Sequence, residues 1–166
     1  MRILIATAGA LSPGPVVRFA ERLVGDGGSV SVATVIEVPR TFLDEIRSEE
    51  WHPLSEGTPP WTNEEDAVIA RYVEERGARL TEPLLAALRS AGVEAAAMFL
   101  EGEDPARTIM EAADEMDADL VILGATKPLF DEAAWESVSA LVMRDARRPV
   151  MVVPTLPRNG GEDQDE

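Results

Sequence analysis

The sequence contains no cysteine and a single histidine, and each scarcity argues against a class of function. Without cysteine the chain has no disulfide, no thiolate nucleophile and no zinc site built on sulfur. His52 lies beside Trp51 in a segment rich in proline and charge, which is typical of a surface position rather than of a catalytic base. Aromatic residues make up only 5% of the chain, so the core must consist of Val, Leu, Ile, Ala and Met.

Long apolar runs are also missing. No stretch approaches the ~20 residues of a membrane helix, and the apolar run at residues 3–6 is too short for the hydrophobic region of a secretion signal. Acidic residues outnumber basic ones by 31 to 15, which gives a formal net charge of -16 and a field that repels phosphate backbones and anionic lipids. We therefore expect no nucleic-acid partner, no membrane partner and a cytoplasmic location.

Short apolar runs alternate with amphipathic segments along the chain. The apolar runs predict strands at residues 2–7, 29–36, 93–100, 119–123 and 149–153. Helical spacing predicts helices at 15–24, at 62–92 with a kink near Gly77 and Pro83, at 105–116 and at 135–146. This alternation predicts an α/β fold: a doubly wound, five-stranded parallel sheet in the order 3-2-1-4-5, with helices on both faces.

Two segments do not follow this pattern. Residues 38–62 have no periodicity and predict a long loop, with room for a short helix at 42–48. This loop either contacts a partner or is an insertion packed by its tryptophans. Residues 157–166 are glycine-rich and acidic, without an apolar residue to anchor them, and predict a disordered tail after a single domain at 1–156.

In a doubly wound sheet, ligands bind beyond the carboxyl ends of the strands, where the direction of winding reverses. In the predicted order that point lies between the first and the fourth strand. The loops after Thr7 and after Leu123 therefore form the candidate site.

Four segments, at residues 3–9, 101–106, 117–124 and 147–154, resemble the universal stress protein family in their sequence and in their order and spacing. The resemblance covers nearly the whole chain to Pro154. It implies a fold like that of the adenine nucleotide alpha hydrolases, and a small cytosolic homodimer that takes part in the stress response. Many members of the family bind ATP, and others do not.

The ATP-binding members resemble one another in an Asp at the end of the first strand and in a motif Gly-x2-Gly-x9-Gly-(Ser/Thr) after the fourth. Glycines let backbone N–H groups approach the phosphates, and the following helix start adds partial positive charge. In this sequence Ala8 stands in place of the Asp, and Gly124 matches the first glycine. Lys127 stands at the second glycine, while Glu136 and Ser137 align with the last two positions in a loop one residue shorter than the motif.

The replacement of glycine by Glu136 is expected to oppose a phosphate. A carboxylate ~4 Å from a phosphate charge costs roughly 4 kcal/mol at an effective dielectric near 20, which is about three decades of affinity. Asp131 and Glu132 add to the repulsion, and Lys127 offers one compensating charge. We therefore expect ATP binding to be weak or lost, with no bound cofactor.

The resemblance outlines an altered nucleotide pocket, in which Val35 matches the strand-two valine that lines the adenine site of the family. The candidate pocket residues are Thr7, Ala8, Gly9, Val35, Gly124, Lys127 and Ser137.

Catalytic machinery is not apparent in the sequence. Ser137 and Ser139 have no histidine nearby in the candidate site to activate them. The adjacent acids Asp131 and Glu132 are typical of a solvated loop rather than of a metal site. The sequence therefore favours a protein that is not an enzyme.

The strand at residues 150–153 is predicted to lie at the edge of the sheet and carries no charge that would discourage pairing. The resemblance implies a homodimer in which this strand pairs with its copy. The alternative is an edge covered by the tail or by Leu156.

Three functions remain open at this point. The first is a non-enzymatic stress-response module that has weak or lost ATP binding and acts through partner contacts. The second is an ATP-binding universal stress protein with a divergent phosphate loop. The third is a nucleotide-processing enzyme of a related α/β class.

Overall fold

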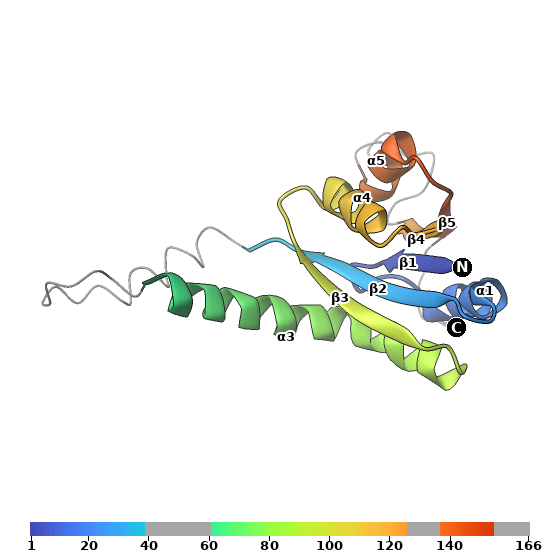
Figure 1. The fold of residues 1–166 in the computed structure, drawn as a ribbon, viewed down its shortest axis with the longest axis horizontal. Coiled ribbons are helices and arrows are strands. Elements are labelled where there is room, and N and C mark those ends of the chain that lie inside the picture. The colour runs from blue at the N-terminus through green and yellow to red at the C-terminus, as the bar shows by residue number, and fades with distance from the viewer. Residues whose placement is uncertain (39–60, 126–136, 155–166) are drawn as a thin grey trace, which may run out of the picture.

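Five parallel strands form one sheet in the order β3-β2-β1-β4-β5 (Figure 1). The structure is a computed structural model that describes residues 1–38, 61–125 and 137–154, without the side chains of 61–66. The strands are β1 (Arg2–Ala6), β2 (Ser29–Ile36), β3 (Ala95–Glu101), β4 (Leu120–Ala125) and β5 (Val150–Pro154). The predicted strand order is confirmed, and so is the position of β5 at an edge of the sheet.

Helices cover both faces of the sheet, as predicted (Figure 1). The helices are α1 (Pro13–Val24), α3 (Trp61–Ser90), α4 (Pro105–Glu115) and α5 (Val138–Asp145). One face packs against α1 and α3, and the other packs against α4 and α5. Of the predicted loop at 38–62, residues 39–60 lie outside the described residues, and so does the predicted tail at 157–166. The loop ends earlier than predicted, because residues 61 and 62 already belong to α3.

The central strand β1 shows why its sequence is a continuous apolar run. Ile3 and Ile5 point into the core layer formed with α1 and α3. Leu4 and Ala6 point into the opposite layer, formed with α4 and α5. All four side chains are buried, because successive residues of a strand alternate between faces that are both covered by helices.

Polar residues fix where α4 and α5 begin. The carboxylate of Asp104 accepts a hydrogen bond from the backbone N–H of Arg107 at 3.2 Å, which caps α4 at the predicted position. Ser137 has an extended backbone and caps α5, so this helix begins at Val138. The prediction that α5 includes residues 135–137 was wrong for Ser137, because a serine side chain at this position stabilises the helix start better than a further helical residue would.

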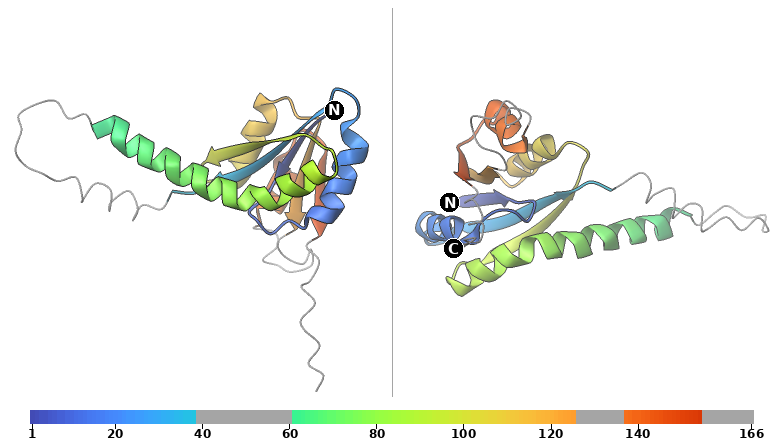
Figure 2. Two further views of the ribbon diagram at one scale, coloured as in Figure 1. Left: turned by 90° about the horizontal axis from the view of Figure 1, so that it is seen from below. Right: turned by 180° about the vertical axis from the view of Figure 1, so that it is seen from behind.

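Helix α3 is longer than the sheet that it covers. Its 30 residues span about 45 Å, whereas the eight residues of β2 span about 26 Å. The amino-terminal end of α3 therefore projects past the sheet (Figures 1 and 2). The helix curves along its length (Figure 2). Pro83, inside it, has no N–H to donate, and the hydroxyl of Thr81 donates to the carbonyl oxygen of Gly77 at 2.9 Å.

The register of the sheet places the candidate site. Ala6, the last residue of β1, lies opposite Ala33 of β2 on one side and opposite Leu123 of β4 on the other. The carboxyl ends of β1 and β4 therefore meet at the point where the winding direction changes. Among the described residues, none of the helices has the length and apolar character needed to cross a membrane.

Candidate functional site

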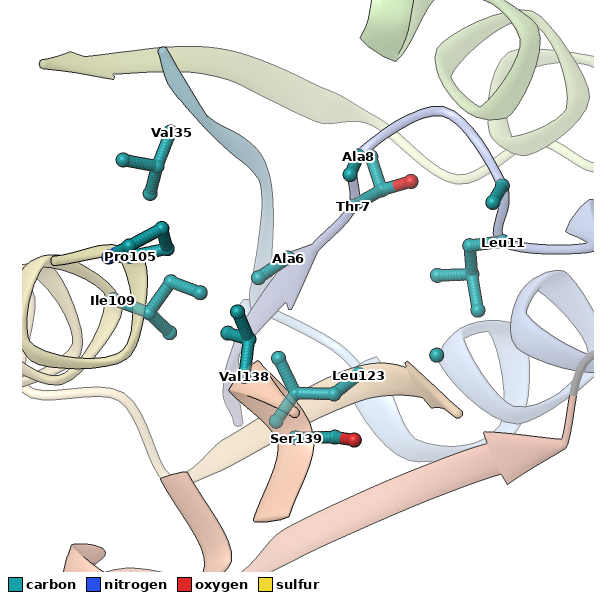
Figure 3. Close-up of a pocket in the computed structure, with 12 residues that line it drawn as sticks. Ala6, Thr7, Ala8, Leu11, Val35, Pro105, Ile109, Leu123, Val138 and Ser139 are labelled. Carbon is teal, nitrogen blue, oxygen red and sulfur yellow. The ribbon is translucent and has the colours of Figure 1, made fainter. Parts of the chain in front are cut away.

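A cavity of about 180 Å³ lies at the carboxyl ends of β1 and β4 (Figure 3). We call it the switch-point cavity. It is lined by Ala6, Thr7, Ala8, Ala10, Leu11, Val35, Pro105, Ile109, Leu123, Gly124, Val138 and Ser139. None of these side chains is charged. The only side-chain polar atoms among them are the hydroxyls of Thr7 and Ser139.

The end of β1 turns sharply because of a local hydrogen bond. The backbone N–H of Thr7 donates to the carbonyl oxygen of Ala33 at 2.9 Å and so continues the pairing with β2. The hydroxyl oxygen of Thr7 then accepts a hydrogen bond from the backbone N–H of Gly9 at 3.0 Å. This turn places Ala8 and Ala10 at the cavity.

Gly9 is required by the turn and by the contact with α3. Its φ angle of 84° lies in the left-handed region, which strongly favours glycine. A Cβ atom at Gly9 would lie 2.9 Å from Cδ2 of Leu80, a residue of α3. Gly9 does not line the cavity, and its N–H is bonded to Thr7. Packing and backbone conformation therefore account for this glycine without a phosphate.

Gly124 closes the cavity on the β4 side. A Cβ atom at this position would lie 3.1 Å from Cδ1 of Leu11, which would then have to move. Leu11 is buried and lies across the cavity from α4 in Figure 3. The glycine therefore lets an apolar side chain fold over the end of β4.

The wall beside α4 is aliphatic. Pro105 opens the helix, and Ile109 follows four residues later on the same helical face. Both point into the cavity near Val35 of β2 (Figure 3). The charged residues Arg107 and Glu111 of α4 are exposed and form an ion pair at 2.8 Å. Its hydrogen bond raises the pKa of the Arg107 guanidinium.

The start of α5 supplies the remaining wall. The hydroxyl oxygen of Ser137 accepts a hydrogen bond from the backbone N–H of Ala140 at 3.3 Å, and it lies 3.2 Å from the hydroxyl of Ser139. Ser139 is buried and lines the cavity, as does the neighbouring Val138. Ser137 does not line the cavity, because its side chain caps the helix.

The structure brings four of the predicted pocket residues together at the cavity. These are Thr7, Ala8, Val35 and Gly124. Gly9 and Ser137 lie next to it in structural roles, while Lys127 and Glu136 lie outside the described residues. The predicted positions His52, Asp131 and Glu132 also lie outside them.

Sequence reasoning missed the aliphatic wall, above all Leu11, Ile109 and Val138. The i to i+4 spacing of Pro105 and Ile109 was a usable signal, since it places both on one face of α4. No sequence signal identified Leu11, whose position depends on the approach of Gly124.

The sequence matches the model of the Universal stress protein family over residues 1–154. The chain belongs to the universal stress protein family. The resemblance seen in the four sequence segments is thereby confirmed. No protein with a curated function matches the sequence.

Solved structures of universal stress proteins share this fold. A universal stress protein in complex with cAMP is 21% identical, with a TM-score of 0.54, and the match covers 94% of this chain and 98% of that one. UspA from Lactobacillus plantarum is 18% identical, with a TM-score of 0.57, covering 92% and 97%. A family protein from Arabidopsis thaliana with AMP bound is 16% identical, with a TM-score of 0.53, covering 98% and 97%. These likenesses show the fold.

The chemistry offered by the described residues is limited. Across 1–38, 61–125 and 137–154, no group of histidine, cysteine or carboxylate side chains is arranged to hold a metal ion. The cavity itself offers apolar contact, two hydroxyls that already have partners, and shape. The described lining is therefore suited to holding an apolar group.

Proposed function

We propose that this universal stress protein is a non-enzymatic module of the stress response that has weak or lost ATP binding and works as a homodimer in the cytoplasm. The observation that carries the proposal is the uncharged lining of the switch-point cavity, with Ala8 where ATP-binding relatives have an acidic residue.

A triphosphate needs several donors or cations close to its oxygens. Among the described residues the lining offers only two side-chain donors, the hydroxyls of Thr7 and Ser139, and Ser139 lies 3.2 Å from the hydroxyl of Ser137. The backbone N–H of Gly9 is bonded to Thr7. The described residues of the cavity therefore supply little that would offset the loss of water around a phosphate. In the sequence, Glu136 stands where the pattern of ATP-binding members has a glycine, and we expect its carboxylate to oppose a phosphate.

Analysis of co-purified small molecules tests this proposal. We expect mass spectrometry of the supernatant of heat-denatured protein to find no ATP in stoichiometric amount. Incubation with ATP and magnesium should yield no product above the rate of a buffer control. Stoichiometric ATP in the supernatant would refute the loss of binding, and product formation would refute the non-enzymatic role.

Dimerisation is supported by the open edge of the sheet. In the described residues β5 pairs with β4 on one side, and Val150, Met151 and Val152 are only partly buried. An uncharged edge strand pairs readily with a second copy. Light scattering coupled to size exclusion should give twice the mass of 17.9 kDa, and a monomer at micromolar concentration would contradict the dimer.

A second candidate is an ATP-binding universal stress protein with a divergent phosphate loop. It is favoured by the presence of Val35 and Gly124 at one cavity, since both match positions of the nucleotide-binding members. Two of the solved relatives are complexes with cAMP and with AMP. Bound nucleotide in the purified protein would favour this candidate. The third possibility, a nucleotide-processing enzyme of a related α/β class, would require product formation.

A further inference from the structure

We propose that the switch-point cavity binds a small, neutral aromatic molecule of one or two rings. The inference rests on the proposed loss of ATP binding, because the cavity is then available to a different ligand. The ligand class follows from the size of the cavity, from its walls and from its single useful polar group.

The size of the cavity fits a ring rather than a whole nucleotide. Its volume is about 180 Å³, whereas pockets for drug-sized ligands and cofactors span roughly 300–1,000 Å³. A dry apolar cavity of about 150 Å³ is known to take up benzene. The switch-point cavity therefore has room for a benzene-sized or indole-sized ring.

The walls select against charge. Val35, Pro105 and Ile109 lie on one side of the cavity in Figure 3, and Leu11 lies on the other. Leu123 and Val138 lie between them in the same view. A charged group placed among these side chains would lose its water without gaining a partner, whereas an aromatic ring would gain contacts on several sides.

One polar atom, the hydroxyl oxygen of Thr7, could orient a bound ligand. The hydroxyl oxygen of Thr7 accepts a hydrogen bond from Gly9, and a hydroxyl oxygen has two lone pairs. It can therefore accept a second hydrogen bond from a ring N–H at the cavity. A ligand with one N–H on an apolar ring, such as indole, matches both the walls and this acceptor.

Val138 and Met143 provide a matched pair of variants on α5. Both are exposed hydrophobic residues, with 36% and 45% of their surface accessible, but only Val138 lines the cavity. Val138→Asp places a carboxylate in the wall while adding favourable charge at the first residue of a helix. Met143→Asp adds the same charge away from the cavity. Ala8→Phe is a second cavity variant, because it would fill the rim from an exposed position.

The experiment is isothermal titration of indole, and separately of magnesium-ATP, into the full chain and its variants, after circular dichroism has confirmed their folding. We expect saturable indole binding to the wild type, at least tenfold weaker binding to Val138→Asp and to Ala8→Phe, and a change of less than twofold in Met143→Asp. Absence of indole binding to the wild type would overturn the inference. Equal affinities of the cavity variants and Met143→Asp would also overturn it.

The two titrations separate this inference from the proposed function. If neither molecule binds, the aromatic site is refuted and the loss of ATP binding stands. If ATP binds at micromolar concentration, the proposed function is refuted, and the indole series still decides the aromatic site on its own. Indole binding that is sensitive to Val138→Asp, without ATP binding, supports both.

Discussion

The same two helices line two hollows of opposite character. At the carboxyl ends of β1 and β4, the two helices contribute Pro105, Ile109, Val138 and Ser139 to the switch-point cavity, whose described lining is uncharged. Toward the amino ends of β4 and β5 they border a hollow of about 350 Å³, which we call the α4–α5 cleft. The cleft is lined by Arg107, Met110, Glu111, Ala113, Asp114, Val121, Val142, Asp145, Ala146, Arg147 and Arg148.

Of the two hollows, only the cleft is lined by charged side chains among the described residues. In the cleft, Arg107 pairs with Glu111, and Arg148 pairs with Asp114. These groups satisfy one another at a surface where water competes for them, so they contribute little to the attraction of a ligand. The described residues that line the cavity carry no charge and few polar atoms, so a ligand gains free energy there mainly by burying apolar surface. The apolar hollow is therefore the better binding site, although it is smaller.

Shortening a side chain should lower the free energy of unfolding far more at the cavity than at the cleft. Leu123 of β4 is buried and lines the cavity, so we expect Leu123→Ala to lower the free energy of unfolding by about 3 kcal/mol. Met110 is only partly buried at the cleft, and Met110→Ala should cost about 1 kcal/mol. Urea unfolding of both variants measures the difference. Equal losses would show that the two hollows are equally part of the core.

Among the charged residues of the cleft, Arg148 is the one whose removal we expect to lower the free energy of unfolding most. Its guanidinium donates hydrogen bonds to the carbonyl oxygen of Ala118 and to the carboxylate of Asp114, and only 21% of its side chain is accessible. We expect Arg148→Ala to lower the free energy of unfolding by about 1.5 kcal/mol. The neighbouring Arg147 is exposed, and Arg147→Ala is the matched control, with no resolvable loss. A loss of equal size in the control would contradict this assignment.

The smallest effect is expected at the exposed pair of Arg107 and Glu111. Glu111→Gln removes one charge of an i,i+4 ion pair at the surface, where salt screens the attraction. The urea midpoint should fall slightly at low ionic strength, and the difference from the wild type should vanish at ~1 M salt. A difference that persisted at high salt would indicate that the cleft is less exposed to solvent than its geometry indicates.

The sequence predicted the fold better than it predicted the site. Ile3 to Ala6 form an unbroken apolar run because both faces of β1 are covered, and this local pattern is enough to identify a central strand. Strand order then follows from the alternation of elements. The start of α5 was predicted too early, since the apolar pattern does not reveal that Ser137 caps the helix.

The site depends on contacts that local patterns do not contain. Gly9 was predicted as a pocket residue from the resemblance alone, and its positive φ angle and its approach to Leu80 could not be read from the sequence. Leu11 and Ile109 come from segments far apart in the chain, and only the fold places them on opposite sides of one cavity. The substitution at Ala8 could be read from the sequence, because the resemblance supplied the residue expected there.

A direct titration of magnesium-ATP tests the central claim that this crevice rejects a triphosphate. It should be made on the wild type and on the double variant Ala8→Asp with Glu136→Gly, which restores two positions of the ATP-binding pattern. We predict no saturable binding to the wild type below millimolar concentration and at least tenfold tighter binding to the double variant. Micromolar binding to the wild type, unchanged in the double variant, would contradict the claim.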